Sequence, residues 1–435
     1  MNNSDYKAYH ESFMRNNHGS NAVHTFLCIF FTVQCTLICA IQENERIDVK
    51  LTCEYIIIVL PLILAHTVYP QYIYLLNALV GVLLLCTIIN KRKRINFVKF
   101  YKLEHTSRKR LHSISCIRGL TYLITSLCIL AVDFKDFPRS LAKTERYGYS
   151  LMDTGVGLFV LISGLVHKDV NSNFSKVVKS NFKFVSILVV LGVSRYVSIK
   201  QLDYHEHVTE YGVHWNFFIT LAVCKLLSTI FLLISDHALI LSICVMIVHE
   251  FLLYYGLEAW VFSNAPRLTL IDANREGISS NLGYVFLYLF AVHLKAMLTY
   301  RNKKQVLLKL VSYSIIFVTL SFVVNLLRPT SRTLANTGYC AFLISILLVI
   351  LTIMFVIEFS LYKGNKMIFQ TPLTLSAINE NGLLYFLICN LSTGFVNIIF
   401  QTMLLPSSIT FVVLNIYMIV TLVIIFYLTK RGIKI

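Results

Sequence analysis

Long apolar runs recur along the whole chain, and they constrain its fold more than any other feature of the sequence. Of the 435 residues, 56% are hydrophobic and only 14% are charged. A soluble protein of this size has too little interior to bury so much apolar surface. Runs of about 18 or more apolar residues instead suit helices that cross a bilayer. The sequence therefore predicts an all-α, polytopic integral membrane protein, treated as one multi-spanning domain over residues 1–435.

The spacing of these runs predicts about thirteen membrane-spanning helices. Their expected ranges are 23–41, 54–69, 71–90, 114–132, 151–167, 183–199, 215–235, 237–255, 281–300, 308–327, 338–359, 382–403 and 408–429. Pro70 separates the second helix from the third. With an odd number of spans, the two termini lie on opposite sides of the membrane.

Basic residues indicate which side is which. The chain has 39 Lys and Arg against 22 Asp and Glu, a formal net charge of +17. A basic chain can bind nucleic acid, but in membrane proteins basic residues accumulate in cytoplasmic loops. With a luminal N-terminus, about 24 of the 39 fall on the cytoplasmic side, many of them in the loop 90–112. We therefore expect a luminal N-terminus, a cytoplasmic C-terminus and no nucleic-acid partner.

In this topology the most polar loops share the luminal face. They cover residues 133–150, 203–214, 271–277 and 328–336. Polar groups at one depth, on helices that pack together, are what a shared site requires. The alternative is a set of unrelated solvated loops.

The first of these loops contains a candidate acid–base pair. Asp133 directly follows an apolar run, and Lys143 lies further along the same loop. Because Pro138 suits the first turn of a helix, residues 137–147 are expected to lie along the membrane surface and bring Lys143 back toward Asp133. Asp133 would then be a general base, and Lys143 its charge partner or a stabiliser of developing negative charge. The alternative is a structural ion pair at a helix end, with Arg139 facing lipid headgroups.

The second loop, in the string DYHEHVTEYGVHWNFF (203–218), concentrates histidines and carboxylates. His207, Glu210 and His214 follow steps of three and four, so they are expected along one face of a helix, where they suit a polyhydroxylated headgroup. The spacing matches no strong zinc pattern, so no metal site is predicted. The alternative is an amphipathic helix end with an aromatic belt.

The remaining loops contain groups that suit a phosphate, because the planar guanidinium of Arg donates to two oxygens at once. Candidates at the starts of two predicted helices are Asn274, Arg275, Arg332 and Asn336. Asp153 is costly inside a membrane and lies close in sequence to the 133–150 loop, so we assign it to the same site. For any single arginine, a positive residue at the membrane interface is the simpler interpretation.

Several strings in this chain resemble a known family. ILAVDF, FPR, AKTE, LMDTGVG, EHVTEYGVHWNFF, ANREGI and LSTGFVN occur in this order within residues 118–403. Together they resemble the glycosylphosphatidylinositol (GPI) inositol acyltransferases of the phosphatidylinositol-glycan class W type. The resemblance implies an endoplasmic reticulum enzyme of GPI-anchor biosynthesis with thirteen spans. Such an enzyme transfers a fatty acyl chain, typically palmitoyl from palmitoyl-coenzyme A, to the inositol 2-hydroxyl of glucosaminyl-phosphatidylinositol.

The resemblance also implies roles for individual residues. It makes Asp133 and Lys143 the catalytic pair of an O-acyltransferase. The chain departs from the usual family pattern at Lys135, Ser140 and His205, where the family usually has Pro, Arg and Gln. These departures weaken any role for a second arginine and for His205.

The hypothesis that follows is direct transfer: Asp133 takes the hydroxyl proton, and Lys143 orients Asp133 and offsets charge on the oxyanion. Inositol or glucosamine hydroxyls would be bound by His207, Glu210, His214 and Asn216, and phosphates by Arg139, Arg275 or Arg332. Expected partners are membrane lipids, glucosaminyl-phosphatidylinositol and acyl-coenzyme A as co-substrate, with no tightly bound cofactor. These loops contain no cysteine, so no acyl-cysteine intermediate is expected.

Two other classes of function are open at this point. A transporter or flippase of a lipid-linked sugar would use the same charges along a substrate pathway, with internal repeats and discontinuous helices. A non-catalytic scaffold subunit would not need an Asp–Lys pair beside a polar wall.

Overall fold

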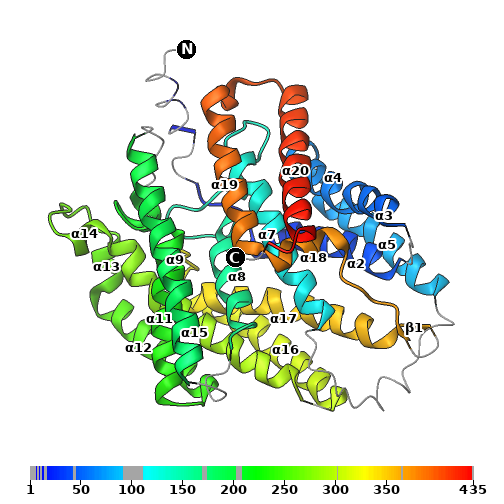
Figure 1. Cartoon of the computed structure of the whole chain (residues 1–435). Helices are drawn as coiled ribbons and strands as arrows, with labels where there is room; N and C mark the ends of the chain where they lie inside the picture. Colours follow the sequence, from blue (N-terminus) through cyan, green and yellow to red (C-terminus); the bar gives the residue numbers. More distant parts are fainter. Residues whose placement is uncertain are drawn as a thin grey trace.

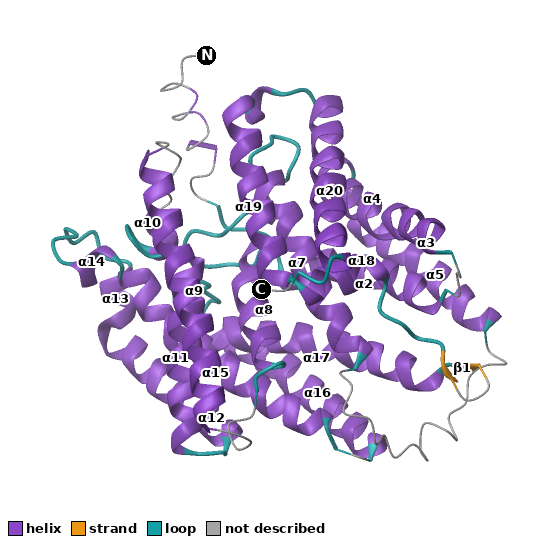
Figure 2. Cartoon of the chain, viewed as in Figure 1, coloured by secondary structure: helices purple, strands orange, loops and turns teal. Residues whose placement is uncertain are grey.

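The computed structural model is a bundle of helices, and among the residues that it describes one pair of short antiparallel strands is present (Figures 1 and 2). It describes residues 17–42, 46–91, 111–168, 174–201, 208–300, 302–363 and 366–433, together with Tyr6, Tyr9, Ser12 and Phe13. The candidate residue His207 lies outside the described residues, as does most of the basic loop 90–112.

The elements of the first half are α2 (Ala22–Ile41), α3 (Ile47–Glu54), α4 (Leu60–Ile63), α5 (Ile73–Asn90), α7 (His112–Ala131), α8 (Leu151–Gly164), α9 (Phe174–Gln201), α10 (Val208–Tyr211) and α11 (Phe217–Ile234). Those of the second half are α12 (Ala238–Leu252), α13 (Glu258–Val261), α14 (Leu270–Ala273), α15 (Arg275–Leu298), α16 (Lys303–Leu327), α17 (Thr337–Ser360), β1 (Tyr362–Lys363), β2 (Lys366–Met367), α18 (Leu373–Glu380), α19 (Gly382–Ile399) and α20 (Ser407–Lys430). Short 3-10 turns lie at Pro70–Tyr72, Arg139–Leu141 and Thr402–Leu404, and π-helical turns at Tyr55–Val59, Leu64–Val68 and Leu253–Leu257.

The prediction of an all-α, polytopic membrane protein is confirmed. In the described part of the chain, eleven helices are long and apolar enough to cross a membrane. Two other predicted spans are also helices: α8 is apolar but has only 14 residues, and α9 has 28 residues. Lysines along α9 lower its hydropathy, so length and composition alone do not select it as a span.

The helix predicted at 281–300 begins earlier, at Arg275. Its first turns carry Glu276, Ser279 and Ser280, which hydropathy assigns to a loop. All three are buried against the rest of the bundle. Tertiary contacts therefore extend the helix beyond the limit of the apolar run.

The core of the bundle is formed around α15 and α17, whose side chains are mostly buried. Figure 1 places α2 to α5 on one side of the molecule and α9 to α13 on the other, with α7, α8 and α19 between them. α7 packs against α8, α18 and α19, whereas α9 packs mainly against α11. The candidate site lies in this middle region, between α7, α8, α9 and α19.

Candidate active site

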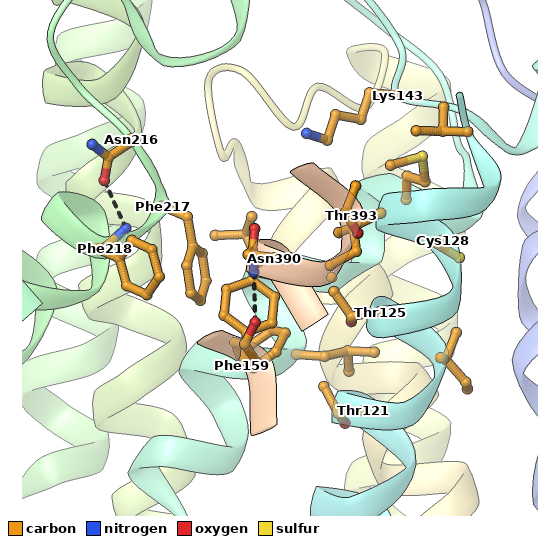
Figure 3. Close-up of a pocket in the computed structure, with 18 of the residues that line it drawn as sticks. Thr121, Thr125, Cys128, Lys143, Phe159, Asn216, Phe217, Phe218, Asn390 and Thr393 are labelled. Carbon is orange, nitrogen blue, oxygen red and sulfur yellow. Dashed lines mark hydrogen bonds between the residues drawn. The ribbon is translucent and has the colours of Figure 1, made fainter. Parts of the chain in front are cut away.

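A cavity of about 680 Å³ opens into the middle of the bundle. This volume is within the range of about 300–1,000 Å³ that is usual for small-molecule sites. Most of its wall is apolar, and ring contacts between Phe159, Phe217 and Phe386 close one part of it, with centroids 5.1–5.2 Å apart. Figure 3 shows Lys143 above this apolar wall. A cavity with charged groups beside a long apolar wall suits an amphiphile.

Six of the charged and polar side chains in the lining come from three segments: the loop after α7, helix α9 and the stretch that begins at α10. They are Asp133, Lys143, Arg195, Glu210, His214 and Asn216. Five of these six belong to the residues predicted from the sequence, and Arg195 does not.

Asp133 lies just beyond the end of α7, where the apolar run stops. Its side chain is 6% exposed and lines the cavity. One carboxylate oxygen accepts a hydrogen bond of 2.6 Å from the side-chain amide of Asn397 in α19. An amide donor fixes the orientation of a carboxylate without cancelling its charge, so Asp133 keeps the ability to accept a proton.

Lys143 lines the same cavity, but its ammonium group pairs with the carboxylate of Glu210. The sequence predicted Asp133 as its charge partner. The structure shows a different arrangement: α10 brings Glu210 to the lysine, and Asn397 holds Asp133. The Lys143 side chain is 36% exposed, so its ion pair is only partly shielded from solvent. The ammonium group therefore remains accessible to a ligand in the cavity.

The loop that carries Lys143 is not the surface helix predicted over 137–147. It contains a single 3-10 turn at Arg139–Leu141. Its backbone carbonyls are bound by the side-chain amide of Asn17, which donates to Arg139, Ala142 and Lys143 at 2.9–3.0 Å. Backbone groups that are satisfied by a distant segment need no helical hydrogen bonds, which explains the wrong prediction.

Replacing Asn17 with Ala is expected to destabilise this loop, because three carbonyls lose their donor. We expect the free energy of unfolding to fall by about 1–3 kcal/mol, seen as a lower thermal midpoint of the purified protein in detergent. Asn17→Asp has the same size but places a carboxylate oxygen against the three carbonyls, so it should be at least as destabilising. A wild-type midpoint for both variants would show that Asn17 does not support the loop.

A buried ion pair holds the same loop from the other side. Arg332 Nε lies 2.9 Å from a carboxylate oxygen of Asp153, and that carboxylate accepts a hydrogen bond of 2.7 Å from the Thr144 hydroxyl. Burial acts to lower the pKa of Arg332, but the charges of Asp153 and then Glu210 outweigh it, so its pKa is raised. Both Asp153 and Arg332 are buried outside the cavity lining. They position the residue next to Lys143.

The predicted helical stripe in the second loop is also wrong. Helix α10 ends at Tyr211, and Gly212 follows with φ +111°, a left-handed conformation that ends the helix. A Cβ at this position would lie 2.5 Å from Cα of Asn274. Glu210 therefore reaches the cavity from α10 and His214 from the turn that follows it, so the two do not share one helix face.

Asn274 fixes this turn from the start of α15. Its side-chain oxygen accepts the backbone N–H groups of His214 and Trp215 at 2.8 and 3.0 Å. It does not line the cavity itself. Asn274 therefore supports the cavity wall from behind the turn without contacting the cavity.

Asn216 lines the cavity and also caps a helix. Its side-chain oxygen accepts the N–H groups of Phe218 and Ile219 at the start of α11, and its amide donates to the Gly192 carbonyl of α9 at 2.9 Å. The ring of His214 lies against Tyr196, with centroids 5.2 Å apart. Together these contacts attach the turn to α9.

Burial, reinforced by the neighbouring Glu210 carboxylate, raises the pKa of Tyr211 well above its ordinary value. Tyr211 lines the cavity. Its hydroxyl therefore stays protonated and remains a hydrogen-bond donor.

The other predicted residues lie outside the cavity lining. The guanidinium of Arg275 donates to the Ser263 carbonyl at 2.6 Å. Asn336 caps α17, accepting the Tyr339 N–H at 3.2 Å. The guanidinium of Arg139 lies 5.7 Å from the centre of the Phe13 ring.

Known proteins of similar sequence show which family this chain is related to. The sequence model of the GWT1 family matches residues 6–428. The "GPI-anchored wall transfer protein 1" of Kluyveromyces lactis is 38% identical, over 70% of each chain. The "Glucosaminyl-phosphatidylinositol-acyltransferase PIGW" proteins of Bos taurus and Mus musculus are 30% and 29% identical, over 97% and 98% of each chain.

The chain belongs to the GWT1 family. This confirms the family that the motifs of the sequence resemble.

The sequence did not predict two functional candidates in this GWT1-family chain. Asn397 donates a hydrogen bond to Asp133, and Asn390, on the same helix, lines the cavity. Both are amides in a mostly apolar α19, and Asn397 ends the string LSTGFVN. Half-buried amides in a membrane helix are costly without a partner. That energetic cost could have pointed to a functional role for the two amides. Close packing of the helix, however, explained the string LSTGFVN equally well.

Cys128 of α7 lines the apolar part of the cavity (Figure 3), although the loops contain no cysteine. Among the residues that the structure describes, no three His, Cys, Asp or Glu side chains come together in a group that could hold a metal ion.

Proposed function

We propose that this protein is an O-acyltransferase of GPI-anchor biosynthesis. It moves a fatty acyl chain, typically palmitoyl, from acyl-coenzyme A to the inositol 2-hydroxyl of glucosaminyl-phosphatidylinositol. The observation that carries the proposal is one cavity in which Asp133 and Lys143 face the same apolar-walled space. The names of the PIGW relatives, which are glucosaminyl-phosphatidylinositol-acyltransferases, support this acceptor lipid.

The proposed reaction is a direct transfer within the cavity. Asp133 removes the proton of the inositol 2-hydroxyl, and the oxygen attacks the thioester carbonyl carbon. The new C–O ester bond forms and the C–S bond breaks. Coenzyme A leaves as the thiol, with the proton that Asp133 took up. Lys143 stabilises the negative charge that develops on the carbonyl oxygen.

Binding both reactants in one cavity also raises the rate of transfer. The apolar wall around Phe159 and Phe217 holds the acyl chain, and Glu210, His214 and Asn216 lie where the headgroup hydroxyls would be bound. Two reactants anchored in one membrane and one cavity already have most of their relative motion removed. The resemblance to the family supports a location in the endoplasmic reticulum membrane. The distribution of Lys and Arg supports a luminal N-terminus and a cytoplasmic C-terminus.

A product assay tests the function. Purified protein is incubated with palmitoyl-coenzyme A labelled in the acyl group and with glucosaminyl-phosphatidylinositol. We expect a labelled inositol-acylated lipid, and none from an acceptor whose inositol 2-hydroxyl is methylated. Absence of product, combined with movement of the lipid between the leaflets of protein-containing vesicles, would replace this proposal by the flippase alternative.

A further inference from the structure

One charged side chain of the cavity has no role in the reaction proposed above. Among the described residues that line the cavity, the Lys and Arg side chains are Lys143 and Arg195. Lys143 pairs with Glu210. Arg195 of α9 is exposed and donates one long hydrogen bond of 3.4 Å to the side-chain oxygen of Asn390 in α19. Most of its donor capacity is available to a ligand.

Helix α19 connects Arg195 to the catalytic carboxylate. Asn390 meets Arg195, and Asn397 holds Asp133 at 2.6 Å. The two asparagines are seven residues apart on one helix, so they share a face and are separated by about 10 Å along the axis. Arg195 and Asp133 therefore contact the same face of α19 at two points along the helix.

The cavity is open to the outside of the bundle along this face. Three α19 side chains line the cavity and are nevertheless strongly exposed: Leu391 at 67%, Phe395 at 65% and Ile398 at 69%. On the opposite side, Arg195 of α9 is both cavity-lining and exposed. Exposed apolar side chains on a membrane helix face lipid. The cavity therefore opens laterally, toward lipid, between α9 and α19.

A glycine leaves this opening free. Gly394 lies between Asn390 and Asn397 in the sequence and lines the cavity. A Cβ added to Gly394 would meet no atom within 4 Å. The space in front of α19 is therefore unobstructed between the two asparagines.

We infer that Arg195 binds the phosphodiester of the acceptor lipid in a lateral opening between α9 and α19, through which the lipid tails remain in the bilayer. The inference rests on the proposed function. In a phosphatidylinositol lipid the phosphate is attached to the ring carbon next to the 2-hydroxyl. The asparagines that contact Arg195 and Asp133 are about 10 Å apart along α19. This spacing leaves room for a phosphate at Arg195 and the neighbouring 2-hydroxyl at Asp133, each with a hydrogen bond of about 3 Å. The planar guanidinium of Arg suits two phosphate oxygens.

Steady-state kinetics of Arg195→Gln test this assignment. We expect the KM for glucosaminyl-phosphatidylinositol to rise about tenfold, the effect of one lost charge-assisted hydrogen bond, with the KM for palmitoyl-coenzyme A unchanged. Arg195→Lys should recover part of the loss. The matched control is Lys183→Gln, which removes an exposed cation of α9 outside the cavity lining and should leave both KM values unchanged.

Competition by phosphatidylinositol gives a second readout. In the wild-type protein it should inhibit acylation competitively against the acceptor, and diacylglycerol, which lacks the phosphate, should not. Arg195→Gln should weaken that inhibition about tenfold. Gly394→Leu places a side chain in the opening and should raise the KM for the acceptor while the thermal midpoint is retained.

The outcomes separate the inference from the proposed function. If wild-type protein forms no acylated lipid, the function itself is wrong. If wild-type protein is active and Arg195→Gln raises the KM for palmitoyl-coenzyme A instead, the arginine binds the phosphates of coenzyme A and the inference is wrong. If Arg195→Gln behaves like Lys183→Gln in both assays, no phosphate is bound at this position.

Discussion

Asp133→Asn is expected to abolish acyl transfer, lowering the rate by at least about a thousandfold. The amide keeps the shape of the side chain and its place in the cavity but cannot accept the hydroxyl proton. The protein should still insert into membranes and bind acyl-coenzyme A, because Asp133 is not part of the apolar wall. Single-turnover measurements with labelled palmitoyl-coenzyme A check the chemical step, and equilibrium binding of the donor checks the fold of the site.

Two control variants sharpen this result. Asp136→Asn removes a carboxylate from the same loop that bonds to Ser407 and does not line the cavity, so it should retain activity. Cys128→Ala removes the thiol in the cavity wall and should also retain activity if the transfer is direct. Near-normal turnover in Asp133→Asn would exclude Asp133 as the base, and an inactive Cys128→Ala would indicate an acyl-cysteine intermediate.

Lys143→Met should lower the rate by about a hundred- to a thousandfold, because it removes the cation that offsets charge on the oxyanion while keeping an unbranched side chain. The loss should appear in kcat more than in KM, since that charge develops only in the transition state. Lys135→Met is the matched control: Lys135 is exposed on the same loop and does not line the cavity. Its kcat should equal that of the wild type.

The Glu210 partner distinguishes a catalytic lysine from a structural one. If Lys143 only holds α10 in place, Glu210→Gln and Lys143→Met break the same ion pair and should lower kcat equally. If Lys143 acts on the oxyanion, Glu210→Gln leaves the cation in the cavity and should cost much less. Equal losses would therefore contradict the catalytic role.

Local features of the sequence were enough to predict much of the site. Asp133 was predicted because it directly follows an apolar run. A helix that spans the membrane has to leave the bilayer where its apolar run ends. The same argument placed Lys143, Glu210, His214 and Asn216 near one depth, and the structure brings all of them to one cavity with Asp133. The helices themselves followed from apolar runs of sufficient length.

Partners were not predictable, because they come from segments far apart in the chain. Asn17 satisfies the carbonyls around Lys143, so that loop is irregular where Pro138 favoured a helix. Gly212 takes a left-handed conformation against Asn274, which ends a helix that spacing alone would continue.

The sequence by itself determined that this chain forms a membrane bundle, roughly where its spanning helices lie, and that polar loops follow them. Hydropathy decides this, since it acts residue by residue along the chain. Only the tertiary structure decided that Asn397 holds Asp133, that Glu210 holds Lys143, and that Arg195 of α9 meets Asn390 of α19. These contacts depend on which helix faces pack together, and no local pattern specifies that choice.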